Sequence, residues 1–529
     1  MRRPSLREHR IHVTLTGLVG LTGLLGAVAA GCSSGPPPPV TKAFAGAATP
    51  AGSWPYPNGD LANTRDAAGS AISSANVSKL REAWTFKLAG TAATSVSYAG
   101  SLAAAPVVAD GTVYLQDLYA NVYAISLATG TLKWEYQANL AEKSGPGPDG
   151  VAVAGGAVYG DTSTAAFALS AATGTVLWND TGLLNSGQGA FEIQPQVSGG
   201  RVYLASAYGS GPGGGVLLAL DAASGKKLWS FSTVAGGEAA GVKSLGLGSG
   251  GAWETPLVGS DGSVTFGTGN PYQSIGEAIS QPSRQLYTDS EVNLDAATGQ
   301  LRWYYQAEPN DFKDYDMQLS PVAASVGGVP AVIGGGKMGD VYAMNADTGA
   351  LLWKTPVGAH NGRDDDSQLL LEHKLRITLP YTYEPGALGG ILTNMAVAGG
   401  SVYLATLDLP LTMTTLGTVN GTGVAGEKPA GEIEALSLAT GKVEWDTTVA
   451  NLPLGAATVS NDLVFTTLDS GELLALNRAT GAVAYRATLP TSTNAPIAVA
   501  GNTLLIPAGG PQVSAKGGGS PQLVAYTVP

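Results

Sequence analysis

The chain has 529 residues, of which 13% are charged, and its formal net charge is −12. A negative surface repels nucleic acid and anionic lipid headgroups, so this charge argues against a nucleic-acid-binding role. The 74 glycines and the 44% of hydrophobic residues are typical of a β-protein with many short strands and tight turns.

The first 31 residues have the pattern of an export signal. A basic leader precedes an apolar, glycine-rich run from Val13 to Ala30, and the letters AAGC follow. This order resembles a bacterial lipoprotein signal, with Cys32 as the lipidation site. Residues 32–53, rich in Pro, Ser, Gly and Ala, are then expected to form a flexible, lipid-anchored tether. We therefore expect an exported protein, anchored to the cell membrane on its extracytoplasmic face. The alternative is an ordinary secretory signal with an incidental cysteine.

A repeated signature runs through the rest of the chain. Its form is Ala-x-(Asp/Asn/Ser)-x-x-(Thr/Ser)-Gly-x-x-x-Trp, and its copies end at Trp134, Trp178, Trp229, Trp303, Trp353, Trp445 and Tyr485. Repetition at about 40 to 50 residues, with longer gaps at inserted loops, indicates a propeller or a solenoid. Each copy predicts a hairpin whose glycine takes a positive φ. The aromatic residue is expected to fill the wedge between neighbouring sheets.

A second repeated element determines the number of sheets. A short apolar strand, a turn and a Val/Tyr-rich strand recur eight times, from APVVADGTVYLQD to NAPIAVAGNTLLIPAGG. The eighth copy runs into PQLVAYTVP and lacks an outer strand, whereas NVSKLREAWTFKL around Trp84 is a strand without a sheet. Residues 54–529 are therefore predicted to be an all-β, eight-bladed propeller of four-stranded antiparallel blades. The N-terminal strand would join the C-terminal blade and close the ring.

Several segments resemble the quinoprotein alcohol dehydrogenases, which bind pyrroloquinoline quinone (PQQ) in an eight-bladed propeller. The matching segments include WPYPNGDLANTR near the start, FGTGNPYQS, EPNDFKDYD and GGGKMGDVYAMNADTG. The resemblance implies an oxidoreductase that oxidises an alcohol or polyol by metal-assisted hydride transfer to PQQ, with Ca²⁺ or a lanthanide as the metal. The electrons would pass to a separate acceptor. Because the chain contains no CxxCH motif, we expect no haem.

The same resemblance implies site residues. Trp253 stands where the family has the indole beneath the quinone ring, and Asn270 where an amide ligates the cation. Asp314 stands at the catalytic aspartate, which also ligates the cation, and Asp316 at an additional carboxylate ligand of lanthanide-using members. Lys337 stands at the cationic side chain that binds the quinone oxygens. Such a site needs a base for the hydroxyl proton and oxygen ligands for a hard cation.

The sequence departs from the family pattern at three places. Ser210 stands where a cation-binding glutamate is expected, and Asp316 or Glu254 are candidate replacements. The family's disulfide between adjacent cysteines is absent, because Cys32 is the only cysteine, and an expected arginine is missing from AEKSGPGPDG. The segment GGILTNMAV replaces a Gly-Gly-x-Asn-Trp run. In addition, residues 408–430 form a long insertion that could overhang one face.

These departures leave a second hypothesis open. The chain could be a quinoprotein-like propeller without cofactor that acts as a binding or assembly scaffold, similar to the outer-membrane-assembly lipoproteins. In that case Trp253 would be another aromatic between blades, and Asn270 would cap a turn. Asp314 and Asp316 would then be solvated loop carboxylates.

Overall fold

The computed structural model describes residues 52–88, 101–140, 147–209, 214–234, 250–419, 430–509 and 520–529. The predicted signal 1–31, the lipidation site Cys32, most of the tether 32–53 and Ser210 lie outside these residues. Within the described residues, no helix is long and apolar enough to cross a membrane.

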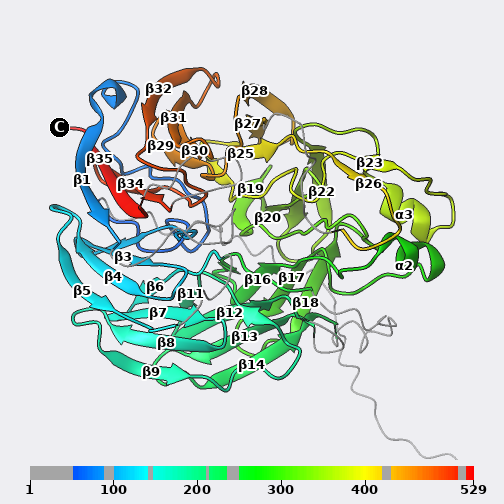
Figure 1. Cartoon of the computed structure of the whole chain (residues 1–529), viewed down its shortest axis with the longest axis horizontal. Coiled ribbons are helices and arrows are strands. Elements are labelled where there is room, and N and C mark those ends of the chain that lie inside the picture. Colours follow the sequence, from blue (N-terminus) through cyan, green and yellow to red (C-terminus); the bar gives the residue numbers. More distant parts are fainter. Residues whose placement is uncertain are drawn as a thin grey trace, which may run out of the picture. The chain divides into compact units, whose positions relative to one another are not determined.

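Eight antiparallel sheets of four strands each follow one another around a ring, as Figure 1 shows, and we number them as blades 1 to 8 in chain order. The strands of blades 1 and 2 are β2 (Val107–Ala109), β3 (Thr112–Gln116), β4 (Val122–Ser126), β5 (Leu132–Tyr136), β6 (Ala152–Ala154), β7 (Ala157–Thr162), β8 (Ala165–Ser170) and β9 (Val176–Asp180). Those of blades 3 and 4 are β11 (Gln196–Ser198), β12 (Arg201–Ala207), β13 (Val216–Asp221), β14 (Lys227–Ser232), β15 (Leu257–Val258), β16 (Ser263–Gly267), β17 (Ser290–Asp295) and β18 (Leu301–Gln306). A short fifth strand, β10 (Ala190–Phe191), also pairs with β12.

The second half of the ring repeats this plan. Blades 5 and 6 consist of β19 (Val322–Val326), β20 (Val329–Gly335), β21 (Asp340–Asn345), β22 (Leu351–Pro356), β24 (Ala396–Ala398), β25 (Ser401–Leu407), β27 (Gly431–Ser437) and β28 (Val443–Val449). Blades 7 and 8 consist of β29 (Thr458–Ser460), β30 (Leu463–Leu468), β31 (Glu472–Asn477), β32 (Val483–Thr488), β33 (Ala498–Ala500), β34 (Thr503–Ala508), β35 (Gln522–Thr527) and β1 (Arg81–Lys87). The predicted all-β, eight-bladed architecture is confirmed.

Blade 8 is built from both ends of the chain. Strand β1 pairs antiparallel with β35, with Arg81 opposite Thr527 and Lys87 opposite Gln522, and a bulge lies between Glu82 and Trp84. Figure 1 shows the two strands side by side, β1 in blue and β35 in red. The predicted closure by the N-terminal strand is therefore confirmed. This closure gives blade 8 the same four strands as the other blades, with β1 as its outer strand.

The aromatic residue that ends each signature joins its blade to the next. The Trp178 indole donates from Nε1 to the Ala222 carbonyl of the following blade at 2.9 Å, and its ring packs on Gly225. The same bond to the next turn recurs at Trp84, Trp134, Trp229, Trp303, Trp353 and Trp445. At the end of the series, the Tyr485 hydroxyl donates to the Leu80 carbonyl at 3.1 Å. The signature thus encodes a contact between blades as well as a hairpin.

The glycine of the signature is needed for this contact, which gives a first testable prediction. A Cβ at Gly225 would lie 2.6 Å from Cε3 of Trp178, whereas a Cβ at Gly200 in the same blade would meet nothing within 4 Å. Their φ angles are +73° and +74°, so an alanine suffers the same backbone strain at both positions. We expect Gly225→Ala to cost about 1–3 kcal/mol more in unfolding free energy than Gly200→Ala. Urea denaturation of both variants measures the difference, and equal costs would contradict the role of the indole contact.

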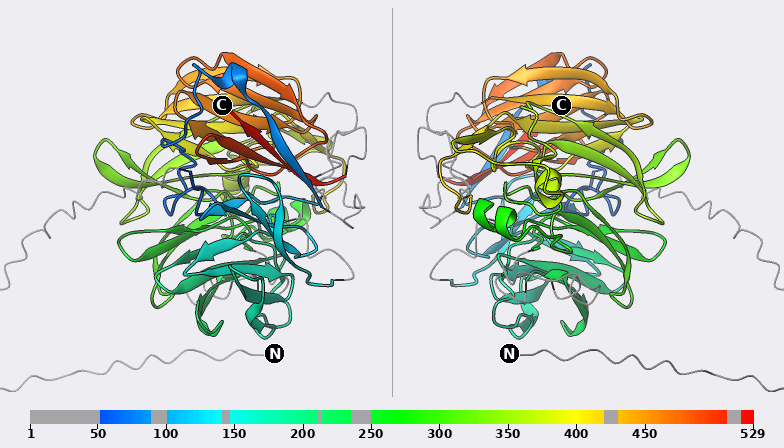
Figure 2. Two further views of the ribbon diagram at one scale, coloured as in Figure 1. Left: turned by 90° about the vertical axis from the view of Figure 1, so that its left-hand side faces the viewer. Right: turned by 90° about the vertical axis from the view of Figure 1, so that its right-hand side faces the viewer.

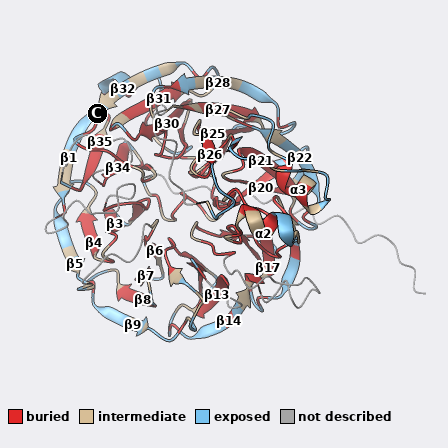
Figure 3. Cartoon of the chain, turned by 45° about the vertical axis from the view of Figure 1, so that its right-hand side comes forward, coloured by how far each residue is buried: buried red, intermediate tan, exposed pale blue. Residues whose placement is uncertain are grey.

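Burial changes from the inner to the outer strands of each blade. The second and third strands of the blades are almost entirely buried, as in β3 and β4, whereas outer strands such as β5 alternate between exposed and half-buried residues. Figure 3 shows the same gradient, with the outer strands in pale blue around the ring. The side chains that could form a shared site are therefore those at the ends of the inner strands.

Residues 54–67, which we call the central segment, form backbone hydrogen bonds with the innermost strands of blades 1, 5, 6 and 7. Arg65 is completely buried, and its guanidinium donates to the Ala457 and Ile497 carbonyls at 2.8 and 2.7 Å. It also donates to Thr458 Oγ1 and to Asn58 Oδ1 at 2.6 and 2.9 Å. These partners come from the N-terminal segment and from blades 7 and 8, so one side chain holds the central segment against two blades.

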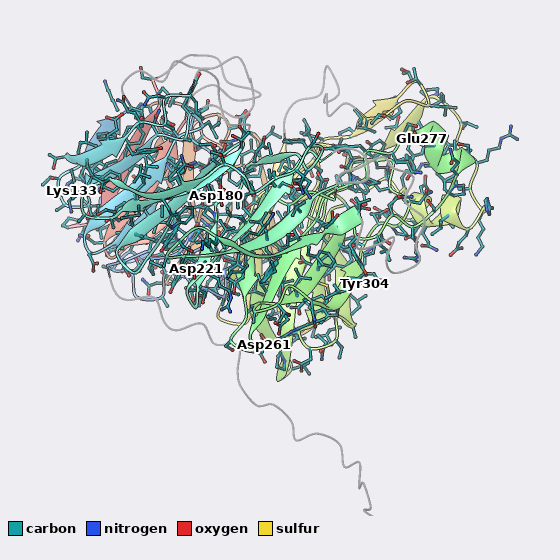
Figure 4. The ribbon with its side chains drawn as sticks, turned by 90° about the horizontal axis from the view of Figure 1, so that it is seen from below. Lys133, Asp180, Asp221, Asp261, Glu277 and Tyr304 are labelled. Carbon is teal, nitrogen blue, oxygen red and sulfur yellow. The ribbon has the colours of Figure 1, made fainter. Side chains whose placement is uncertain are left out.

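A small helical projection interrupts the repeat at blades 4 to 6. It contains α2 (Ile275–Ser280), α3 (Asp366–Leu371) and a two-stranded sheet of β23 (Tyr381–Tyr383) and β26 (Leu411–Met413). Ser274 and Glu277 form a capping box at the start of α2. Figure 1 shows this projection at the right-hand side of the ring, the right-hand view of Figure 2 shows its helices facing the viewer, and Figure 4 labels Glu277 on α2. Part of the predicted insertion 408–430 thus forms β26, whereas residues 420–429 lie outside the described residues. A further short helix, η1 (Val77–Lys79), precedes β1.

Candidate functional site

The five residues implied by the resemblance belong to blades 4 and 5 and lie at the same end of these blades. Trp253 precedes β15 and Asn270 follows β16, while Asp314 and Asp316 precede β19 and Lys337 follows β20. Because neighbouring strands are antiparallel, the start of a first strand and the end of a second strand meet at one edge of the sheet. The five residues, which are far apart in the sequence, therefore lie close together in the fold.

Asp314 is held by an amide on one side and an ammonium group on the other. The Asn270 side-chain amide donates to Asp314 Oδ1 at 2.6 Å, and the Lys337 ammonium donates to Asp314 Oδ2 at 3.0 Å. Burial raises the pKa of Asp314 to about 7, although Lys337 opposes the shift. A carboxyl with a pKa near neutrality is suited to accept a proton at physiological pH. The Asp314 side chain remains 16% exposed, so it is accessible to a small molecule.

Asp316 shares the same ammonium group. Lys337 Nζ lies 2.5 Å from Asp316 Oδ2, and the Asn270 backbone N–H donates to Asp316 Oδ1 at 2.8 Å. Burial alone would lower the pKa of Lys337, but the two carboxylates raise it above its usual value. Lys337 is therefore charged, and it binds Asp314 and Asp316 together.

The loop that carries both aspartates is fixed by its own backbone contacts. Asp311 accepts hydrogen bonds from the N–H groups of Lys313 and Tyr315 at 2.9 and 3.0 Å, and Asp314 between them has a φ of +67°. The Tyr383 hydroxyl donates to the Lys313 carbonyl at 2.8 Å. The strained residue is thus surrounded by ordered partners, which is the usual situation of a functional residue in a left-handed conformation.

Trp253 joins this group through a glycine. A Cβ at Gly269 would lie 2.8 Å from Cη2 of Trp253 and 2.7 Å from Oδ1 of Asp316, so both side chains approach the same Cα. Gly269 directly precedes Asn270, and its N–H donates to the Gly251 carbonyl at 2.7 Å. Trp253 is half-buried. The structure therefore brings an indole, an amide, two carboxylates and an ammonium group together.

Glu254 does not belong to this group. The Asn394 amide donates to Glu254 Oε2 at 2.8 Å. Burial raises the pKa of Glu254 to about 7, against this bond and the charge of Arg65. Glu254 therefore interacts with the central segment, so the carboxylate missing at position 210 is not supplied by this residue.

A second buried acidic group lies at blades 2 and 3, and sequence reasoning missed it. Asp149 and Asp161 are buried and lie close enough to influence each other's pKa, and Glu192 interacts electrostatically with both. Burial raises the pKa of Asp149 to about 7 and that of Glu192 to about 9. Glu192 is therefore largely protonated at neutral pH, whereas Asp149 titrates near neutrality. A sequence signal was present, because Asp161 is the one charged residue of an inner strand.

A hard metal ion is poorly matched to the described residues. Ca²⁺ takes six to eight oxygen ligands, with carboxylates prominent among them. Among the residues that the structure describes, no group of three or more His, Cys, Asp or Glu side chains is arranged to hold a metal ion. The two candidate carboxylates, Asp314 and Asp316, are already paired with Lys337. The predicted ligands Asn270, Asp314 and Asp316 are thus adjacent, but they form an ion-paired group.

A family model described as the β-propeller domain of glucose/ethanol/alcohol dehydrogenases matches residues 54–358. The chain belongs to this PQQ-type dehydrogenase family. A second model, described as outer membrane protein assembly factor BamB, matches residues 429–521. The family match covers blades 1 to 5, and thus every residue of the candidate site.

Individual relatives of this dehydrogenase family are distant. Quinoprotein alcohol dehydrogenase PedH of Pseudomonas putida is 25% identical over 464 residues, which is 77% of each chain. Among solved structures, the quinohemoprotein alcohol dehydrogenase of Comamonas testosteroni superposes with a TM-score of 0.76 at 23% identity, covering 90% of this chain and 80% of the other. A europium-containing methanol dehydrogenase gives 0.75 at 18% identity, covering 90% of this chain and 98% of that chain. At these identities the structural matches show the fold alone.

Proposed function

We propose that this protein binds PQQ at blades 4 and 5 and oxidises an alcohol or polyol. The observation that carries the proposal is the position of Asp314, which the Asn270 amide and the Lys337 ammonium hold beside the indole-lined Gly269. A planar tricyclic cofactor is suited to an indole face, and its oxygens to a fixed ammonium group. The membership of the chain in the PQQ-type dehydrogenase family supports the same function.

Three residues of the chain would have different roles in the oxidation of the substrate. When bound, PQQ supplies an electrophilic quinone that takes up the two electrons of the alcohol. Asp314 would accept the hydroxyl proton of the substrate, because its pKa of about 7 leaves a large fraction ionised at neutral pH. Asn270 orients this carboxylate, and Lys337, which binds the same carboxylate, would supply positive charge to a bound quinone. The electrons would then leave to a separate acceptor.

Reconstitution tests the proposal directly. Purified protein lacking residues 1–31 would be incubated with PQQ, with and without Ca²⁺ or La³⁺, and separated from free quinone by gel filtration. We expect stoichiometric quinone absorbance in the protein fraction and dye-linked oxidation of primary alcohols or polyols. Absence of bound quinone under every metal condition would reject the proposal.

A second candidate is a cofactor-free scaffold, which the match of residues 429–521 to the BamB model favours. This alternative predicts no retention of quinone in the same experiment. For either function we propose an exported protein, attached to the extracytoplasmic face of the cell membrane through lipidated Cys32. Labelling with a radioactive fatty acid, compared between wild type and Cys32→Ser, tests the attachment.

A further inference from the structure

The ammonium group of Lys337 lies between the two carboxylates that the resemblance assigns to a metal ion. Its nitrogen is 3.0 Å from Asp314 Oδ2 and 2.5 Å from Asp316 Oδ2. An ammonium group has three donors, so these two contacts leave one N–H for a further acceptor. The side chain of Lys337 is 12% exposed, so that donor can be reached by a bound molecule.

The backbone holds Lys337 beside Asp316. The Lys337 N–H donates to the Asp316 carbonyl at 3.0 Å. A Cβ at the preceding Gly336 would lie 1.9 Å from this carbonyl oxygen. Only a glycine at position 336 therefore allows the two segments to approach so closely. The lysine is therefore anchored at its main chain next to the carboxylate that its side chain binds.

The negative charge of the two aspartates is already partly neutralised by the lysine. Asp314 and Asp316 carry at most two negative charges, and the Lys337 ammonium offsets one of them. Two further carboxyl groups nearby, Asp289 and Asp311, have raised pKa values because both are buried. A divalent or trivalent ion would have to displace the ammonium and would gain few anionic ligands. Position 210, where the resemblance expects another carboxylate, is a serine.

We propose that the Lys337 ammonium takes the place of the metal ion, so that this protein binds PQQ without one. The inference rests on the proposed function, because it concerns how the same site holds the quinone. The free N–H of Lys337 would donate to a quinone oxygen and supply the positive charge that a metal ion otherwise provides. Asp314 and Asp316 then hold the ammonium, and Asp314 also accepts the hydroxyl proton of the substrate.

The metal part of the proposal is tested without any quinone. Terbium luminescence, excited through tryptophan, reports binding near an indole such as Trp253, which approaches the same glycine as Asp316. Purified protein would be treated with a chelator, exchanged into chelator-free buffer and titrated with Tb³⁺. We expect weak luminescence that is identical in wild type and Asp316→Asn. A tight luminescent site in the wild type that Asp316→Asn abolishes would overturn the proposal.

The quinone part is tested by calorimetric titration of the same protein with PQQ. We expect dissociation constants in the presence of EDTA, Ca²⁺ and La³⁺ to agree within about twofold. Binding that requires a metal ion, or becomes more than tenfold tighter with one, would overturn the inference while leaving the proposed function intact. If PQQ does not bind at all, the proposed function fails, and the terbium titration still decides whether the ammonium excludes a metal ion.

A matched pair of variants assigns the effect to Lys337. Lys337→Met should weaken PQQ binding in EDTA at least tenfold, because it removes the ammonium and leaves two carboxylates facing the quinone. Lys354→Met is the control, since Lys354 also pairs with a buried aspartate of blade 5, at 2.8 Å from Asp340. We expect its PQQ affinity to be unchanged. Melting temperatures confirm that both variants fold, and equal PQQ affinity in Lys337→Met and wild type would overturn the proposal.

Discussion

Asp314→Asn is expected to reduce the turnover number of the PQQ-loaded protein by about 10²- to 10⁴-fold. An asparagine keeps the shape of the side chain, and its one carbonyl oxygen can still accept from the ammonium of Lys337, but it cannot accept the hydroxyl proton. The affinity for PQQ should change much less than the turnover number. Dye-linked assays at saturating alcohol, together with a PQQ titration, separate the two quantities.

Asp347→Asn is a suitable control for this experiment. Asp347 is exposed in the turn between two strands of blade 5. Its replacement by asparagine is the same chemical change at a position away from the site. We expect its turnover to equal that of the wild type. Turnover in Asp314→Asn within threefold of the wild type would reject Asp314 as the base, whereas a loss of PQQ binding would instead give it a role in holding the cofactor.

Arg65→Met is expected to lower the unfolding free energy by about 2–5 kcal/mol, because it removes a buried group whose hydrogen-bond partners then lose their donor. Arg65 is completely buried, and four hydrogen bonds join it to the central segment and to blades 7 and 8. Burial lowers its pKa to about 9, against the opposing charge of Glu254. A methionine would remove the donor to the Ala457 carbonyl, one of the two donors to the Ile497 carbonyl and the positive charge that acts on Glu254.

An exposed arginine provides the comparison. Arg486 on β32 pairs with Glu472 at 2.7 Å, and its side chain is 55% exposed. Because exposed ion pairs contribute about 0–1 kcal/mol, Arg486→Met should change the urea midpoint little. If both variants unfold at the same urea concentration, the central segment does not hold the ring together.

The architecture was predictable because each blade carries its own signal. The turn glycine, the strand that follows it and the terminal aromatic recur together, and each has one structural role in the contact between Trp178, Ala222 and Gly225. The closure by β1 was predictable for a related reason. One sheet lacked an outer strand, and one strand near Trp84 lacked a sheet. Local sequence patterns and a count of strands were sufficient to predict the eight blades and their closure.

Features without a repeat were not predictable in the same way. The projection with α2 and α3 is formed by segments of blades 4 to 6 that share no pattern with the other blades. The proximity of Asp149, Asp161 and Glu192 depends on how neighbouring blades meet, which a single sequence does not encode locally. Likewise, the family resemblance placed Asp314, Asp316 and Lys337 in one site, but only coordinates show that the lysine binds both aspartates.

The pairing of β1 with β35 has a consequence for how the molecule loses its structure. In an open solenoid, terminal repeats can fray while the remainder stays folded, because each repeat contacts only its neighbours. Here β1 and β35 are hydrogen-bonded partners within one blade, so the ring has no terminal repeat. Detaching residues 522–527 breaks the circle and exposes two blade faces at once. We therefore expect the blades to unfold together, without a stage in which one end of the ring has frayed.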